Sequence, residues 1–84
     1  MYYVYLIQSK APELRRYVGF SRDLRQRFSD HNEGKLPSTA KYRPWQLVTY
    51  LGFSSKREAL AFERYLKSGS GHAFAKRRLW ILES

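Results

Sequence analysis

Three stretches of the chain carry the aromatic, aliphatic and β-branched residues that predict β-strands. They are Tyr2–Gln8, Arg16–Ser21 and Trp45–Phe53, and such residues favour extended, half-buried structure. The segment Lys10–Glu13 lies between the first two and contains a proline, which has no backbone donor for a sheet ladder, so it predicts a turn. The first two strands are therefore expected to form an antiparallel hairpin.

A helix is predicted directly after the second strand. Ser21 is placed to cap it, Asp23 adds a negative charge to its first turn, and the helix is expected to end near Gly34. The next segment, Lys35–Pro44, holds two prolines and shows neither helical nor strand periodicity. It is expected to be a basic loop.

Two more helices are predicted after the third strand. Ser55 and Glu58 have the spacing of a capping box, which opens a helix from Lys56 to about Lys67. Ser68–Gly71 interrupts the helical pattern, and Ala73–Leu82 has the pattern of a last helix. The order β-β-α-β-α-α predicts an α/β fold of the α+β kind, with a three-stranded antiparallel sheet flanked by helices and the first strand in the middle.

The composition fits one small globular domain over residues 1–84. A chain of 84 residues has room for one modest core. Its apolar fraction of 43% and aromatic fraction of 17% supply that core and argue against disorder.

The net charge of the chain indicates a polyanionic partner. Sixteen Lys and Arg against seven acidic residues give a net charge of +9. Such an excess repels itself in the folded state, and nucleic acid is the partner that relieves it best. A basic domain without such a partner is the alternative. For a bound duplex, we expect phosphate contacts from Arg15, Arg16, Arg22, Arg25, Lys41, Arg43, Lys76, Arg77 and Arg78.

Several kinds of chemistry are excluded. The chain has no cysteine, so it has no disulfide, zinc–thiolate site or thiol nucleophile. It begins without the features of a secretory signal, and no apolar run approaches the roughly 20 residues of a membrane helix. A cytoplasmic protein without membrane contact is the expectation.

Candidate chemistry begins with two tyrosines on neighbouring strands. Because side chains alternate along a strand, Tyr5 shares a face with Tyr3 and Ile7, while Tyr17 shares one with Gly19. Pairing of the strands can bring Tyr5 and Tyr17 onto the same side of the sheet. The alternative is that they are ordinary strand tyrosines, which are frequent in sheets.

The helix after the third strand carries an acid where apolar residues are expected. At about 100° per residue, Ala59, Leu60, Phe62 and Leu66 form one apolar arc, and Glu63 lies inside it. A carboxylate there is costly unless an arginine, a metal ion or protonation compensates it. A metal site and a buried Glu–Arg pair are both open.

The first helix places Arg27 and His31 side by side, four residues apart. A lone histidine on this stripe is usually a core residue. The arginine beside it adds a guanidinium, which can bind two phosphate oxygens, next to an imidazole, a group that titrates near neutral pH. Together with Tyr5, Tyr17 and Glu63, the pair suits phosphodiester hydrolysis, which needs a deprotonated water and neutralisation of charge on the phosphate.

The ordered set of motifs resembles the GIY-YIG nuclease superfamily, and in particular its small stand-alone bacterial proteins of uncharacterised UPF0213-like type. The match covers nearly the whole chain and depends on the ordered set rather than on either tripeptide. Its parts are Tyr3-Val4-Tyr5, Tyr17-Val18-Gly19, Ser21-Arg22-Asp23-Leu24, Arg27, His31-Asn32, and Glu58-Ala59 leading to Glu63 and Leu66-Lys67.

The resemblance implies a compact sandwich around the sheet and metal-dependent hydrolysis, often of DNA, with one Mg²⁺ or Mn²⁺ on Glu63. It assigns Tyr5 as the favoured general base, with Tyr17 as the second signature tyrosine. Arg27 would bind the scissile phosphate and His31 would assist water activation. A low-specificity endonuclease acting in DNA repair or recombination is the leading hypothesis, with a protein partner for targeting as a further possibility.

Departures from the family pattern keep other hypotheses open. Tyr3 stands where the first signature has glycine, valine replaces isoleucine in both, and no asparagine follows the glutamate helix. The first alternative is a catalytically idle module that binds nucleic acid through the same basic surface. The second is a small interaction protein. The sequence does not separate DNA from RNA, and it does not give the oligomeric state.

Overall fold

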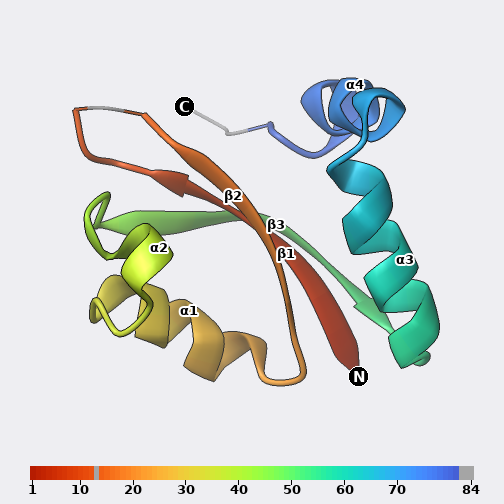
Figure 1. Cartoon of the computed structure of the whole chain (residues 1–84), viewed down its shortest axis with the longest axis horizontal. Coiled ribbons are helices and arrows are strands. Elements are labelled where there is room, and N and C mark those ends of the chain that lie inside the picture. Colours follow the sequence, from red (N-terminus) through yellow and green to blue (C-terminus); the bar gives the residue numbers. More distant parts are fainter. Residues whose placement is uncertain (13, 82–84) are drawn as a thin grey trace.

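In the computed structural model, which describes residues 1–12 and 14–81, a three-stranded antiparallel sheet separates two groups of helices (Figure 1). The strands are β1 (Tyr2–Ser9), β2 (Arg16–Ser21) and β3 (Trp45–Phe53). Their order in the sheet is β2-β1-β3, so the prediction of a central first strand is confirmed.

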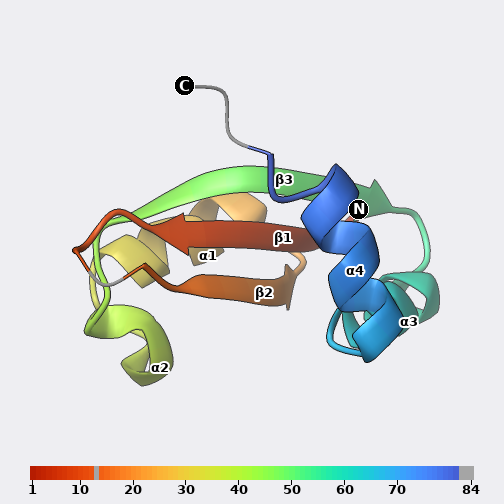
Figure 2. The same ribbon diagram turned by 90° about the horizontal axis from the view of Figure 1, so that it is seen from above.

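The helices are α1 (Leu24–Asn32), α2 (Pro37–Ala40), α3 (Lys56–Leu66) and α4 (Gly69–Arg78). The predicted order β-β-α-β-α-α is confirmed, with the short α2 added within the segment expected to be a loop. Turning the view by 90° shows α3 and α4 gathered at one end of the sheet, away from α2 (Figure 2).

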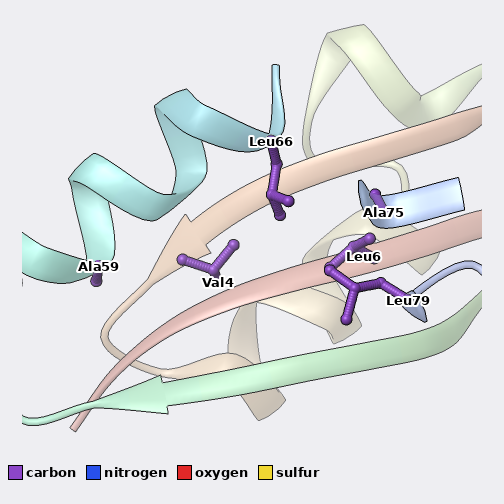
Figure 3. Close-up of a cluster of buried hydrophobic side chains, with 6 residues drawn as sticks. All are labelled: Val4, Leu6, Ala59, Leu66, Ala75 and Leu79. Carbon is purple, nitrogen blue, oxygen red and sulfur yellow. The ribbon is translucent and has the colours of Figure 1, made fainter. Parts of the chain in front are cut away.

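The central strand is buried on both faces. Val4, Tyr5, Leu6 and Ile7 are all fully buried, because alternate residues of β1 enter two different cores. Val4 and Leu6 pack with Ala59, Leu66, Ala75 and Leu79 under α3 and α4 (Figure 3). Tyr5 and Ile7 join Trp45 in the second core, which also receives Leu24 and Phe28 from α1. We call this second side of the sheet the α1 face.

The N-cap of α1 differs from the prediction. Asp23 is the cap, and its carboxylate accepts the Gln26 backbone N–H at 3.1 Å. Ser21 still belongs to β2 and pairs with Tyr3, and its hydroxyl instead bonds the backbone of Asp23. The strand thus ends at Ser21 as predicted, and the cap of the helix lies two residues later than predicted.

The helix α2 begins at Pro37, and proline is compatible with a first helical turn because no intrahelical partner is needed for its missing N–H. The sequence pattern treated this proline as a breaker. At α4, Ser68 caps the helix by accepting the Gly71 N–H at 3.2 Å, so the helix begins at Gly69 rather than Ala73.

Other boundaries are close to the predictions. The helix α3 is capped by Ser55, whose hydroxyl accepts the Glu58 N–H at 3.2 Å. The helix α4 ends at Arg78, earlier than predicted, and residues 79–81 are not helical; Leu82, the predicted end, lies outside the described residues, as does Glu13 of the predicted turn. In the described part of the chain, none of the helices has the length and apolar character needed to cross a membrane.

Candidate active site

Tyr5 and Tyr17 lie next to each other on the α1 face of the sheet, with ring centroids 6.3 Å apart. The prediction that they share one side is confirmed. Tyr5 is paired in register with Gly19 of the edge strand β2. A methyl group on Gly19 would overlap the Tyr5 ring carbon Cζ and the hydroxyl oxygen. Because Gly19 has no side chain, the Tyr5 phenol can lie over β2 and extend toward the edge of the sheet.

His31 joins Tyr5 to helix α2. Its Nε2 atom lies 2.8 Å from the Tyr5 hydroxyl, and its Nδ1 atom lies 2.7 Å from the Thr39 hydroxyl. The Thr39 O–H is directed to the Leu36 carbonyl at 3.4 Å, which leaves the Thr39 oxygen to accept from Nδ1–H. In that tautomer Nε2 is the acceptor, and the Tyr5 O–H donates to it.

Thr39 was missed by the sequence analysis. It is buried, and its backbone carbonyl also accepts the Trp45 indole N–H at 2.9 Å. The segment that carries it was expected to be a loop, and threonine has no chemistry of its own that singles it out. Helix α2 brings it to His31, so it becomes visible only with the fold.

The Tyr5–His31 pair is held uncharged at neutral pH. Burial raises the pKa of Tyr5 far above its usual value; neighbouring Tyr17 adds to the rise, while the charge and hydrogen bond of Arg27 oppose it. Burial also lowers the pKa of His31 below 6.5, and the positive charge of Arg27 adds to that effect. A neutral phenol therefore donates to a neutral imidazole.

The lowered pKa of His31 gives a prediction for stability. The folded state binds a proton on His31 less readily than the unfolded state, so stability is full above pH 6.5 and falls as the pH decreases toward the folded-state pKa. We expect the melting temperature to drop between pH 7 and pH 5.5. In His31→Gln this drop is expected to be much smaller, whereas His72→Gln, at an exposed histidine, should retain it.

Arg27 is half-buried beside Tyr5 and has no ion-pair partner among residues 1–12 and 14–81. It lies close enough to Tyr5 for its charge and a side-chain hydrogen bond to lower the pKa of that phenol. A guanidinium with spare donors next to two phenols is suited to bind a phosphate oxygen pair.

Glu63 lies in α3, with a side chain that is 20% exposed. The alternative of a buried Glu–Arg pair is wrong, because the partner is Lys67 one turn later, at 3.2 Å between Nζ and Oε2. The negative charge of Glu63 makes the smallest contribution to the raised pKa of Tyr5, although α3 packs on the opposite face of the sheet. The helix α3 also contacts the edge strand β2, on which Tyr17 lies.

The donor set restricts the metal that fits here. No group of three or more His, Asp or Glu side chains is close enough to hold an ion within the described residues. A closed zinc site is therefore not built by this part of the chain. One hard carboxylate oxygen, with water and substrate phosphate as further ligands, is a binding mode typical of Mg²⁺. Glu63 fits a single Mg²⁺ or Mn²⁺.

The predicted phosphate-contacting residues are all exposed, which is compatible with that use. Several are held by aromatic rings: the guanidinium of Arg22 lies 5.3 Å from the Tyr2 ring centroid, and that of Arg16 lies 4.9 Å from the Trp80 ring. Their contact with nucleic acid stays a prediction.

Comparison with known proteins gives one consistent result. The model of the GIY-YIG catalytic domain matches residues 1–77. UPF0213 protein YazA of Bacillus subtilis (strain 168) is 42% identical over 52 residues, which cover 61% of this chain and 52% of that protein. UPF0213 protein SSP2268 of Staphylococcus saprophyticus is 36% identical over 70 residues, covering 82% of this chain and 83% of that protein.

A eukaryotic relative is similar over a shorter share of its length. The structure-specific endonuclease subunit SLX1 homolog of Giardia intestinalis is 35% identical over 65 residues, covering 73% of this chain and 18% of that protein. The chain thus spans about half of the Bacillus relative and a small part of the Giardia one. No solved structure is significantly similar to the chain.

Proposed function

The chain belongs to the GIY-YIG catalytic-domain family, and on this premise we propose that it is a metal-dependent endonuclease that hydrolyses phosphodiester bonds in DNA with low sequence specificity. The proposal treats residues 1–84 as one domain. The observation that carries it is the cluster of Tyr5, Tyr17 and His31, whose ring centroids lie 5.1 to 6.3 Å apart, with Arg27 beside it and Glu63 across the edge of β2.

Arg27 is proposed to hold the scissile phosphate. Its donors are not engaged by a carboxylate in the described chain, and its planar fork matches two phosphate oxygens. Glu63 would hold Mg²⁺ or Mn²⁺, which when bound supplies positive charge to the phosphate and the leaving oxygen. Lys67 then loses its partner and is free to contact the nucleic acid backbone.

Tyr17 is proposed as the phenol that meets the attacking water. It is partly exposed, and its hydroxyl has no hydrogen-bond partner among the described residues. Tyr5, which the family resemblance favours as general base, is fully buried, and burial raises its pKa. In this proposal Tyr5, His31 and Thr39 form a fixed hydrogen-bonded chain beside Tyr17, in which the Tyr5 oxygen can take up a proton while its own proton passes to Nε2 of His31.

Substrate choice in this proposal follows from the basic surface. Contacts to phosphates are independent of sequence, so binding should be weakened strongly by salt and only slightly by base changes. The SLX1 homologs are named structure-specific endonuclease subunits, which supports endonuclease activity and a protein partner for targeting. A role in DNA repair or recombination is part of the proposal. A cytoplasmic location remains part of the proposal.

The direct test is nicking of supercoiled plasmid and of branched oligonucleotides in Mg²⁺ or Mn²⁺, with chelator as the control. Metal-dependent nicking is the expected result. Binding of both DNAs without nicking in either metal would instead support a nucleic-acid-binding module. That second function is favoured by the missing asparagine after α3.

The two tyrosines are expected to respond differently to replacement by phenylalanine. Tyr17→Phe should lower the cleavage rate by roughly 10²- to 10³-fold, as loss of a general base does, with an unchanged melting temperature. Tyr5→Phe should lower the rate and also cost about 1–3 kcal/mol of stability, because it leaves the buried Nε2 of His31 without a donor. A Tyr17→Phe protein that cleaves at the wild-type rate would contradict the proposal that Tyr17 is the phenol that contacts the attacking water.

A further inference from the structure

A hollow beside Tyr17 is not used by the proposed hydrolysis. It has a volume of about 480 Å³ and lies between β2, the end of α3 and α4. Its floor is apolar and contains Val18, Leu66 and Ala75. Tyr17, at the edge of the sheet, contributes both to this hollow and to the cluster with His31. The hollow lies on the side of β2 that α3 and α4 cover, and Tyr17, at the edge of the sheet, connects it with the cluster on the α1 face.

The rim of the hollow is basic and aromatic. Arg16, Lys67 and Lys76 contribute to it, and no acidic residue does. Arg16 is fixed in place: its Nε donates to the Gln8 side-chain oxygen at 3.0 Å, and its guanidinium lies on the ring of Trp80. An apolar floor with an aromatic ring and cations at the rim is the surface on which nucleobases stack while their phosphates are neutralised.

We propose that this hollow is a nucleobase subsite, which takes one unpaired nucleotide of the strand being cut next to the scissile phosphate. The inference rests on the proposed nuclease function, because it places the phosphate at Arg27 and Tyr17. A single base fits a volume of this size, whereas a base pair within a duplex stays stacked and does not enter. Extracting a paired base costs a few kcal/mol, so strands with unpaired nucleotides are preferred substrates.

Ala73 offers a way to fill the hollow without replacing any of the proposed catalytic residues. It is exposed on α4 and lines the hollow, so Ala73→Phe should place a ring where the base would lie. Ala61 is exposed on α3 and lies outside the hollow, which makes Ala61→Phe the matched control. Both variants keep the net charge unchanged, so the phosphate contacts are the same.

The test measures binding in chelator, where no cleavage occurs, by the anisotropy of dye-labelled 12-nucleotide oligodeoxyuridylate, oligouridylate and a DNA duplex. Ala73→Phe is expected to weaken single-strand binding about tenfold, the effect of losing one stacked base, and to leave duplex binding unchanged. Binding of either single strand with this loss supports the subsite and identifies the sugar. Equal single-strand affinities for Ala73→Phe and Ala61→Phe overturn it.

Tryptophan fluorescence gives a second measure at the site itself. Trp45 is only 4% exposed, so quenching by an added oligonucleotide reports on Trp80 at the hollow. Quenching is expected in wild type and not in Ala73→Phe, and its absence in wild type overturns the subsite. If the wild-type protein shows this quenching but does not nick DNA in Mg²⁺ or Mn²⁺, the nuclease proposal is wrong and the subsite stands. If the wild-type protein nicks DNA and Ala73→Phe leaves single-strand binding unchanged, the subsite is wrong and the nuclease proposal stands.

Discussion

Replacement of Glu63 by glutamine is expected to abolish metal-dependent cleavage and to leave the fold unchanged. Glutamine keeps the size of the side chain but loses the negative charge that a divalent ion requires. The structural loss is small, because among the described residues Glu63 pairs only with Lys67, whose side chain is 55% exposed to solvent. Such i, i+4 pairs contribute about 0.3–0.5 kcal/mol. The cleavage rate should fall to background while the melting temperature changes by little.

The matched control is Glu58→Gln, which makes the same change of charge on the same helix. Glu58 is exposed in the first turn of α3, five residues before Glu63. It should cleave DNA at nearly the wild-type rate and lose only the few tenths of a kcal/mol that an acid contributes at a helix N-terminus. If Glu63→Gln cleaves as well as Glu58→Gln, Glu63 holds no catalytic ion. If it melts far below Glu58→Gln, Glu63 is a structural residue.

The order of the strands could be predicted because both sets of alternate residues in β1 are apolar. Alternate residues of Tyr2–Gln8 are apolar on both sides, which is the pattern of a strand covered on both faces, and a hairpin leaves such a strand in the middle. The same alternation placed Tyr5 and Tyr17 on one side. These features depend only on the period of a strand, which the sequence carries directly.

The features that were missed depend on contacts between distant segments. Pro37 was treated as a breaker, although its position at the start of α2 makes it compatible with a helix. Thr39 acquires its role only because α2 lies against α1, where its hydroxyl meets His31 eight residues earlier. The sequence also could not predict which of the two phenols is exposed. The alternation of side chains along a strand gives the face on which Tyr5 and Tyr17 lie, but not which hydroxyl reaches the solvent.

The glycine of the second signature has a purely steric role in this structure, which predicts a large effect for Gly19→Ala. The added methyl group would overlap the Tyr5 phenol and approach Cε2 of Tyr17 to 2.9 Å. Tyr5 must then move away from His31 and Arg27, and a misplacement of about 1 Å can cost about 10²-fold in rate. Overpacking should also destabilise the protein by about 1–3 kcal/mol.

Gly52→Ala is the matched control for this prediction, since Gly52 lies on the other neighbour of β1, opposite Tyr3. A methyl group there meets Cε1 of Tyr3 at 3.3 Å, which a shift of a few tenths of an ångström relieves. Its rate and stability should stay close to wild type. A double-mutant cycle locates the clash: in a Tyr5→Leu background, Gly19→Ala should cost less stability than it does in wild type, by about 0.5–3 kcal/mol. Equal costs in the two backgrounds, or wild-type cleavage by Gly19→Ala, would mean that Tyr5 does not occupy the space above this glycine in solution.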